Sequence, residues 1–213
     1  MRSWWIYDVL FNIDKMTRLA KLSKKYDCKV AATMLFTLSP VHDDAFWADK
    51  ADKLSAIPEV DSLLLYDTGG VLHRDRIKTL VPAIVANARG KPVEMHSNNM
   101  LGQSAKAYCD AVEFGVTVLH TAARSMANGP SIPSIDIMVK NMETLGHTHD
   151  IDVPKLQPGS EHFRKVAKTA GYLHDQHYEY DVTSLTTQIP GGMMGTLRNQ
   201  LIQHNMLDML PQV

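Results

Sequence analysis

The ten residues VEMHSNNMLG, at positions 93–102, change character halfway along their length. They begin with the alternation of apolar and polar side chains that is typical of a β-strand, and they become wholly polar just before a segment of helical period. Side chains two residues apart project from the same face of a strand, so Glu94, His96 and Asn98 are expected to converge on one place. The stretch therefore predicts a strand that leads into a helix and carries a site at its carboxyl end.

Short apolar runs rich in β-branched residues recur along the chain, and a segment of helical period follows each of them. The expected strands are Trp4 to Tyr7, Lys29 to Phe36, Ser62 to Tyr66, Pro92 to His96 and Val116 to His120. A βα order repeated about five times with short connections predicts an α/β fold with a parallel sheet covered by helices. Such a sheet is either open and doubly wound or part of an eight-stranded barrel, and the pattern alone does not choose.

Helical periods without strands follow residue 134. The expected helices cover 135–145, Phe163 to Leu173 and Met194 to Leu210. The sequence therefore predicts two regions, a βα region over 1–133 and a helical extension over 134–213.

Composition limits the classes of function. The 213 residues, 45% of them hydrophobic, are enough for one substantial core. Lys and Arg number 22 against 23 Asp and Glu, which leaves no excess positive charge for holding a nucleic acid. Cys28 and Cys109 have neither the spacing of a zinc site nor the density of a disulfide scaffold. With no signal-peptide or membrane-spanning run in the sequence, we expect a cytoplasmic protein.

Polar side chains gather where each expected strand ends. They are Asp8 after the first strand, Thr37, Ser39 and His42 after the second, Asp67 after the third, His96 and Asn98 at the fourth, and His120 at the fifth. In parallel βα folds the carboxyl ends of the strands hold the active site. Any one of these residues is explained by exposure at a strand end, whereas the whole set favours a site.

Several motifs, in the correct order, give the chain a resemblance to a known family. They are Tyr7–Asn12 (YDVLFN), Thr37–His42 (TLSPVH), Leu65–Leu72 (LYDTGGVL) and Ile189–Met193 (IPGGM). Together they resemble the carboxyltransferase domain of biotin-dependent enzymes, as in the oxaloacetate decarboxylase alpha subunit and the corresponding pyruvate carboxylase subunit. That domain is a metal-dependent lyase barrel related to hydroxymethylglutaryl-CoA lyase. The resemblance implies that this chain is a partial TIM barrel, made of about five C-terminal βα units and a helical extension.

The resemblance also implies the positions of a metal site. The family binds a divalent metal, zinc or manganese, with two histidines, an aspartate and a carboxylated lysine. The histidines fall on His96 and Asn98 and the lysine on Tyr66, which cannot form a carbamate, while the aspartate has no counterpart in this sequence. The resemblance makes Asp67 the catalytic candidate. Glu94 and His120 are expected as substitute ligands or as ordinary hydrogen-bonded residues, and they join Tyr66 and Asp8 as pocket candidates.

The motifs match only part of the family domain. If Trp4 to Tyr7 is the fourth barrel strand, the first three strands lie outside this sequence, as do the family's V-T-P-S-S-K segment and its biotin-bearing A-M-K-M motif. We therefore expect a fragment, or a subunit that another polypeptide completes. Biotin is expected only as carboxybiotin on a partner domain.

Two functions of different classes follow. The first is a piece of a biotin-dependent carboxyltransferase or decarboxylase that acts on a small keto acid such as pyruvate or oxaloacetate. Its expected partners are a biotin carrier, a biotin carboxylase or membrane decarboxylase subunits, the missing N-terminal half of the barrel, and further copies of the chain. The second is a catalytically silent paralogue that serves as an assembly or scaffold subunit.

Overall fold

A computed structural model describes residues 3–180, 182, 185 and 188–212. The chain forms two compact units, here called the sheet unit and the helical unit. The sheet unit comprises Met1–Asp67, Leu72–Ser97 and Ala105–His120, and the helical unit comprises Thr68–Val71, Asn98–Ser104 and Thr121–Val213. The boundary between residues 133 and 134 stays a prediction.

The sheet unit contains five parallel strands in the spatial order β1-β2-β3-β4-β5. The strands are β1 Ser3–Ile6, β2 Lys29–Phe36, β3 Ser62–Asp67, β4 Val93–Ser97 and β5 Val118–Leu119. All five lie at the predicted places, and the fifth is shortened to two residues. The sheet does not close on itself, so the predicted α/β partial barrel is confirmed as an open five-stranded segment.

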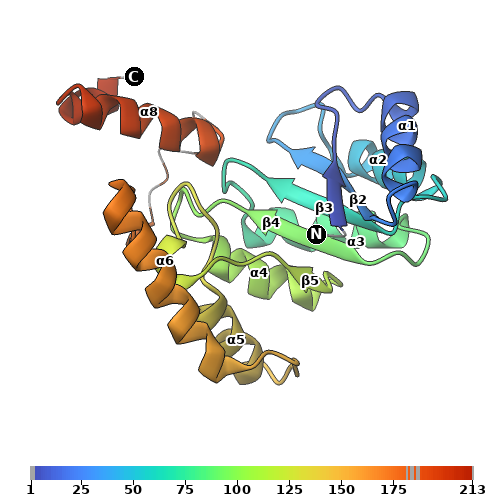
Figure 1. The fold of residues 1–213 in the computed structure, drawn as a ribbon. Coiled ribbons are helices and arrows are strands. Elements are labelled where there is room, and N and C mark those ends of the chain that lie inside the picture. The colour runs from blue at the N-terminus through green and yellow to red at the C-terminus, as the bar shows by residue number, and fades with distance from the viewer. Residues whose placement is uncertain (1–2, 181, 183–184, 186–187, 213) are drawn as a thin grey trace. The chain divides into compact units, whose positions relative to one another are not determined.

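A helix follows each of the first four strands (Figure 1). These helices are α1 Ile13–Lys24, α2 Asp44–Ser55, α3 Arg74–Ala86 and α4 Ser104–Glu113. Asn12 caps α1 by accepting a hydrogen bond from the backbone N–H of Lys15, and Asp43 caps α2 in the same way through Phe46. Parallel neighbours need such crossover connections, since a tight hairpin turn joins only antiparallel strands.

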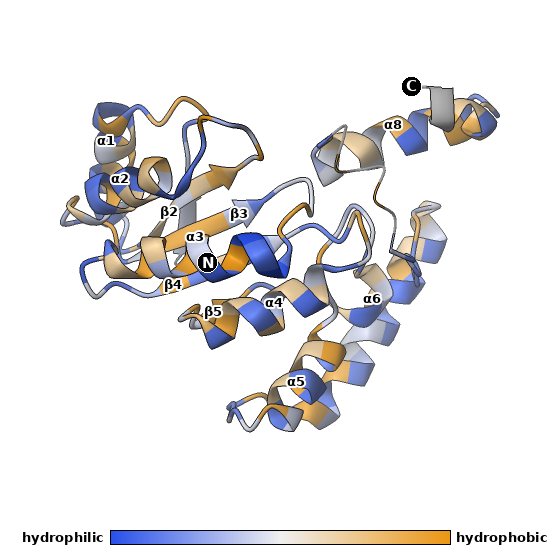
Figure 2. Cartoon of the chain, turned by 180° about the vertical axis from the view of Figure 1, so that it is seen from behind, coloured by the Kyte–Doolittle hydropathy of each residue, from blue (hydrophilic) through white to orange (hydrophobic). Residues whose placement is uncertain are grey.

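One face of the sheet forms the main core with the helices. The strand residues on this face are fully or nearly fully buried, and they include Val30, Ala32, Met34, Phe36, Leu63, Leu65 and Met95. From the helices, Trp47, Leu80 and Tyr108 are buried to the same degree. Figure 2 shows that β2 is largely hydrophobic, whereas β3 becomes hydrophilic towards its carboxyl end. The core therefore occupies the middle of the strands, and polar chemistry begins where the strands end.

The opposite face of the sheet, here called the inner face, has a different composition. Strand alternation and the parallel register place on it Trp5, Thr33, Leu64, Tyr66, Glu94 and His96. In a closed barrel this face is the interior. The inner face is thus where a barrel-type site would lie.

The helical unit contains α5 Ile135–Thr144, α6 Leu156–Ala170 and α8 Gly191–Gln203, with short 3₁₀ segments η1 Arg124–Met126, η2 Val153–Lys155 and η3 Leu207–Gln212. The three predicted helices are present with shifted bounds. The second ends at Ala170 because Gly171 adopts a left-handed conformation with φ of 71°. The third begins at Gly191, directly after Pro190, and ends at Gln203.

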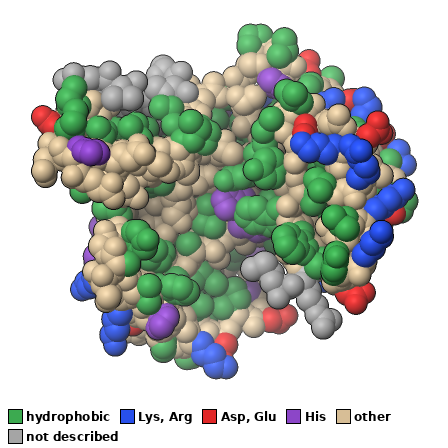
Figure 3. Space-filling model, turned by 45° about the horizontal axis from the view of Figure 1, so that its top comes forward, with side chains coloured by type: hydrophobic (Ala, Val, Ile, Leu, Met, Phe, Trp, Pro, Cys, Tyr) green, Lys and Arg blue, Asp and Glu red, His purple; other side chains and the backbone are tan. Residues whose placement is uncertain are grey.

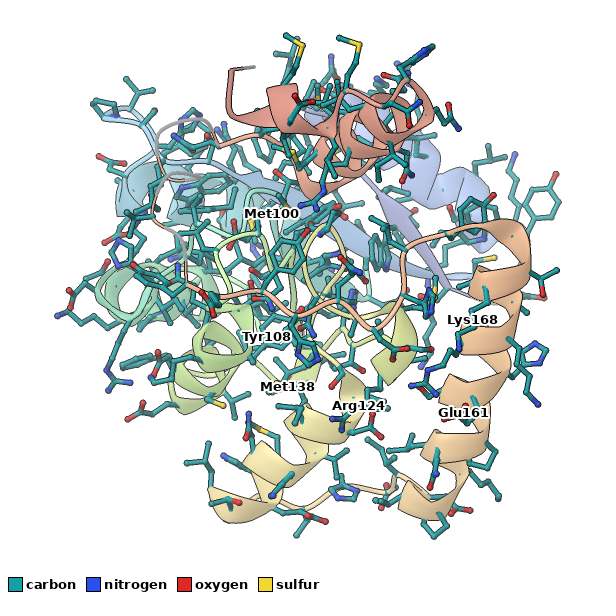
Figure 4. The ribbon with its side chains drawn as sticks, turned by 90° about the vertical axis from the view of Figure 1, so that its left-hand side faces the viewer. Met100, Tyr108, Arg124, Met138, Glu161 and Lys168 are labelled. Carbon is teal, nitrogen blue, oxygen red and sulfur yellow. The ribbon has the colours of Figure 1, made fainter. Side chains whose placement is uncertain are left out.

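Hydrogen bonds join α6 to η1 (Figure 4, where Arg124 marks η1, and Glu161 and Lys168 mark α6). The backbone N–H of Ser125 donates to Ser160 Oγ at 2.9 Å, and Ser125 Oγ donates to the Ser160 carbonyl at 2.7 Å. Arg164 on α6 also binds the Asp175 carboxylate through two nitrogens, at 2.6 and 2.7 Å. These contacts fix α6 within the helical unit.

Two glycine-containing motifs meet in the helical unit. The backbone N–H of Gly191 donates to the Thr68 carbonyl at 2.8 Å, which joins the IPGGM segment to the DTGG turn. A Cβ on Gly70 would lie 2.0 Å from the Asn98 carbonyl oxygen, and a Cβ on Gly191 would lie 2.7 Å from the Pro130 carbonyl oxygen. Glycine is therefore required at both positions, because the neighbouring backbone lies too close to leave room for a Cβ atom.

We predict that Gly70→Ala destabilises the protein far more than Gly90→Ala. Both glycines have positive φ, 66° and 76°, so both substitutions introduce left-handed strain of about 1–2 kcal/mol. Only Gly70 also faces a backbone atom, because nothing lies within 4 Å of a Cβ at Gly90. Urea unfolding of both variants measures the difference, and equal losses of stability would contradict the close approach at Gly70.

We also predict self-association along the edge strand β1. Among the described residues β1 pairs only with β2, so its other edge has no strand partner there. A groove of about 400 Å³ beside it is lined by Trp4, Tyr7, Leu19, Leu22 and Tyr26, all substantially exposed. Leu22→Glu should weaken the association, whereas Leu145→Glu, at a similarly exposed leucine that caps α5, should not. Sedimentation velocity over a concentration series tests this, and a monomer at every concentration would refute it.

Candidate functional site

The fourth strand and its neighbours bring four predicted site residues together on the inner face. Glu94 and His96 share that face because they are two residues apart in β4. The register pairs Tyr66 of β3 with His96, and their rings are 4.5 Å apart at an angle of 68°. His120 follows β5, where its backbone N–H donates to the Met95 carbonyl at 3.0 Å.

A chain of hydrogen bonds runs through this cluster. Ser62 Oγ donates to Glu94 Oε1 at 2.5 Å, and Nε2 of His120 lies 2.8 Å from Glu94 Oε2. The Nδ1 atoms of His120 and His96 are 3.4 Å apart, a long contact for a hydrogen bond. We call these four residues, Ser62, Glu94, His96 and His120, the inner-face cluster.

Aromatic rings cover the inner-face cluster. The indole of Trp5, from β1, stacks on the His120 ring with centroids 4.7 Å apart and planes at 17°. The same indole meets the His96 ring edge-on at 5.0 Å and the Tyr66 ring at 6.1 Å. A side chain of the first strand thus reaches a residue that follows the fifth strand, which requires the sheet to curl as barrel strands do.

Glu94 carries the negative charge of the cluster. Burial by itself raises the pKa of its carboxyl group, but hydrogen bonds from His120 and Ser62 and the electrostatic interaction with the His120 ring outweigh that effect. The net pKa of Glu94 is lower than its ordinary value, so the carboxylate is ionised at neutral pH. Its two oxygens accept from different partners, which fixes the orientation of the Glu94 carboxylate.

The side chains of His96 and Tyr66 are held neutral. Burial, together with the electrostatic interaction with the His120 ring, lowers the pKa of His96 to about 4. Burial raises the pKa of Tyr66 above its ordinary value, with smaller contributions from Tyr7 and Asp67. At neutral pH, His96 is therefore an uncharged imidazole and Tyr66 is an uncharged phenol.

Asn98 lies in the helical unit and makes different contacts. Its Nδ2 donates to the Pro130 carbonyl at 2.5 Å, and its Oδ1 is buried without a hydrogen-bond partner among the described residues. The strand ends at Ser97, so the strand period that would extend the face of Glu94 and His96 to Asn98 does not continue. Asn98 therefore follows the strand and is not part of it, and its place beside Glu94 and His96 in a metal site stays a prediction.

Asp67 and Asp8 also take up separate positions. Asp67 is fully buried and accepts hydrogen bonds from the Leu72 N–H at 2.9 Å and from Ser97 Oγ at 2.8 Å. Alternation along β3 directs it away from the face that carries Tyr66. Asp8 binds Lys15 at 2.6 Å and the backbone N–H groups of Leu10 and Asn12, and these contacts lower its pKa. A catalytic role for Asp67 and a pocket role for Asp8 stay predictions.

The described residues do not fit the metal site that the resemblance implies. Of the four ligand positions, only His96 offers a nitrogen ligand, and Tyr66 is a neutral phenol. Within the described ranges, no group of three or more His, Cys, Asp and Glu residues is arranged to hold a metal ion. Glu94 and His120 are engaged with each other, and together with His96 they form no such group.

Two members of this site, Ser62 and Trp5, are missing from the candidates that the sequence supplies. In the sequence, Ser62 is only the start of an expected strand, and Trp5 is only part of an apolar run. The two-residue period of β3 places Ser62 on the same strand face as Tyr66. This period is the sequence signal that could have identified Ser62. Trp5 reaches the cluster through the curl of the sheet, which no local pattern encodes.

Charge and hydrophobicity agree with the limits set by composition. On the face shown in Figure 3, Lys and Arg side chains are interspersed with Asp and Glu and form no large basic patch. Among the described residues, no helix has the length and apolar character needed to cross a membrane. The cytoplasmic compartment stays a prediction.

We predict that acidification destabilises the protein through His96. Its pKa is about 4 in the folded chain against 6.5 for the ordinary group, so the unfolded chain binds more protons between these values. The stability is fully present above pH 6.5 and falls by up to roughly 3 kcal/mol as the pH decreases to 4. Glu94, whose folded pKa is also lowered, adds a further loss only below its ordinary value of 4.5.

Urea unfolding between pH 7 and pH 5 measures the contribution of His96. The decline should be reduced in His96→Phe and retained in His149→Phe, which removes a histidine paired with Glu143 on α5. An identical decline in the wild type and in His96→Phe would show that another group is responsible.

Comparison with known proteins identifies relatives of one kind. No protein-family model matches the sequence. The chain is 28% identical to a pyruvate carboxylase subunit of Methanothermobacter thermautotrophicus over 209 residues, which are 98% of this chain and 36% of that protein. It is 26% identical to the 2-oxoglutarate carboxylase large subunit of Hydrogenobacter thermophilus, covering 97% of this chain and 32% of that protein. It is 24% identical to the methylmalonyl-CoA carboxyltransferase 5S subunit of Propionibacterium freudenreichii, covering 98% and 41%.

Solved structures show the same fold. The carboxyl transferase domain of Rhizobium etli pyruvate carboxylase, determined with pyruvate and biocytin, matches with a TM-score of 0.84 and 18% sequence identity. The match covers 97% of this chain and 35% of that one. The structure of the same domain with 3-bromopyruvate matches with a TM-score of 0.86 over 100% of this chain and 36% of that one.

The chain thus spans about a third of the length of the first relatives that it matches. The resemblance seen in the sequence motifs is confirmed: this chain is related to the carboxyltransferase components of pyruvate carboxylase-type enzymes, and it has the fold of part of their carboxyltransferase barrel.

Proposed function

We propose that this chain is a portion of a biotin-dependent carboxyltransferase or decarboxylase that acts on a small keto acid such as pyruvate or oxaloacetate. The observation that carries the proposal is the match to carboxyltransferase relatives over nearly the whole chain. The meeting of the DTGG turn with the IPGGM segment supports it, because two motifs of the resemblance, far apart in sequence, form one packed structure.

The proposed partners follow from the part that the chain represents. A biotin carrier would deliver the carboxyl group as carboxybiotin, and a biotin carboxylase or a membrane decarboxylase subunit would load or unload it. The remaining barrel strands would pair with the exposed edge of β1, and further copies of the chain would complete an oligomer. The open sheet supports the need for such a partner.

The inner face bears on whether the chain itself is catalytic. In this family type, a divalent metal would polarise the keto-acid carbonyl and stabilise the enolate. The described residues do not supply that ligand set, and no Lys or Arg side chain among them hydrogen-bonds or pairs with the inner-face cluster. These observations favour the second candidate, a catalytically silent paralogue that serves as an assembly or scaffold subunit.

We expect that the purified chain binds no stoichiometric metal and does not decarboxylate oxaloacetate. Ligand number governs both the affinity and the geometry of a catalytic metal site, and one imidazole falls short of a set. Elemental analysis after dialysis measures bound metal, and a pyruvate-release assay with and without manganese or zinc measures turnover. One tightly held metal per chain, or turnover that disappears in His96→Ala, would establish a different ligand set and an active enzyme.

A restoration experiment separates the two candidates. Tyr66→Lys with Asn98→His should leave this chain inactive, because the first-strand aspartate and the late threonine of the family are not in its sequence. The same double substitution in a longer chain that supplies those segments should raise metal affinity. Failure in that context as well would favour the scaffold candidate.

A further inference from the structure

The hydrogen bonds of the inner-face cluster determine which imidazole nitrogens carry protons. Both oxygens of Glu94 are acceptors, because the carboxyl group has a lowered pKa and an ionised carboxylate has no proton to donate. The short 2.8 Å contact with His120 therefore requires an N–H at Nε2 of His120. If His120 carries a single ring proton, held at Nε2 by Glu94, its other nitrogen is an acceptor and Nδ1 presents a lone pair.

The same reasoning extends to His96. Its Nδ1 lies 3.4 Å from Nδ1 of His120, and two lone pairs facing each other at that distance would repel. The arrangement is favourable only if Nδ1 of His96 carries the proton. Nε2 of His96 is then the unprotonated nitrogen. Among the described residues it has no hydrogen-bond partner, and it is not one of the fully buried side-chain atoms that lack a partner.

Packing holds the two rings in these orientations. Trp5 covers the face of the His120 ring, and both Trp5 and Tyr66 lie against the His96 ring. Ser62 fixes the other oxygen of Glu94, so the carboxylate cannot rotate without losing a hydrogen bond. Each group in the sequence Ser62, Glu94, His120, His96 is thus positioned by the one before it.

We propose that Glu94 and His120 are positioning residues that fix His96 with Nε2 as its unprotonated nitrogen, forming a metal-free acceptor site for an O–H or N–H group of a ligand. The site occupies the inner face, where the resemblance implies a metal centre that the described residues do not fit. The proposal does not rest on carboxyltransferase activity, since tautomers can be measured in a silent protein as well as in an enzyme.

The test is histidine tautomer assignment by long-range ¹H–¹⁵N NMR on ¹⁵N-histidine-labelled protein at pH 8, where ordinary imidazoles are neutral. We expect His120 protonated at Nε2 and His96 protonated at Nδ1. In His120→Phe, which keeps a ring under Trp5 and removes both nitrogens, the unprotonated Nε2 signal of His96 should be lost as the proton moves to Nε2. Glu94→Gln should also mix the tautomers of His120, because an amide can donate as well as accept.

His149 provides the matched control. It also pairs with a glutamate, at 3.0 Å from Glu143, and its Nδ1 accepts from the Ile151 N–H, so it should be protonated at Nε2. His149→Phe should leave the signals of His96 and His120 unchanged.

Three results would overturn the proposal. The first is protonation of His96 at Nε2 in the wild type, which needs no variant to fold. The second is an unprotonated Nε2 of His96 that persists in His120→Phe. The third is tight binding of one zinc ion per chain when Zn²⁺ alone is titrated, with loss of that binding in His96→Phe, which would identify a metal site in place of an acceptor site.

Discussion

The parallel register between β3 and β4 is the constraint on which the site depends. It places Tyr66 opposite His96 and, through the two-residue period of both strands, assigns Glu94 and His96 to the inner face and Asp67 and Ser97 to the other. A shift of one residue would exchange the two sets and bury charged groups against the helices. The apolar residues Leu63, Leu65 and Met95 hold the register, because they can be buried under the helices in this alignment only.

The glycine motifs supply a second, separate constraint in the helical unit. The DTGG turn, the Asn98 backbone and the start of α8 approach so closely that a Cβ at Gly70 or Gly191 would overlap other atoms. This packing gives a physical reason for glycine in two motifs that lie more than a hundred residues apart in the sequence. Both motifs belong to the resemblance, which in this chain therefore covers tight turns as well as strands.

The inner face departs from the chemistry that the likeness implies. A carboxylated lysine and two histidines would form a charged centre, whereas Tyr66 and His96 are neutral and the carboxylate of Glu94 accepts hydrogen bonds from Ser62 and His120. Hydrogen bonds link Ser62, Glu94 and His120, and the indole of Trp5 stacks on the His120 ring. The chain therefore shares the fold of the matched carboxyltransferase structures, while its inner-face residues do not fit the metal set that the resemblance implies.

The amino-acid sequence by itself determined the order of the elements and the family resemblance. Apolar period, caps and glycines are local signals, so the five strands, the C-terminal helices and the alternation of Glu94 with His96 could be predicted from them. Only the tertiary structure decided which polar residues meet. It placed Asp67 on the face of β3 opposite Tyr66, where it accepts a hydrogen bond from Ser97, and it gave Asn98 a hydrogen bond to the Pro130 carbonyl. It added Trp5, because contact between the first strand and a residue after the fifth depends on the curl of the whole sheet, which no window of sequence contains.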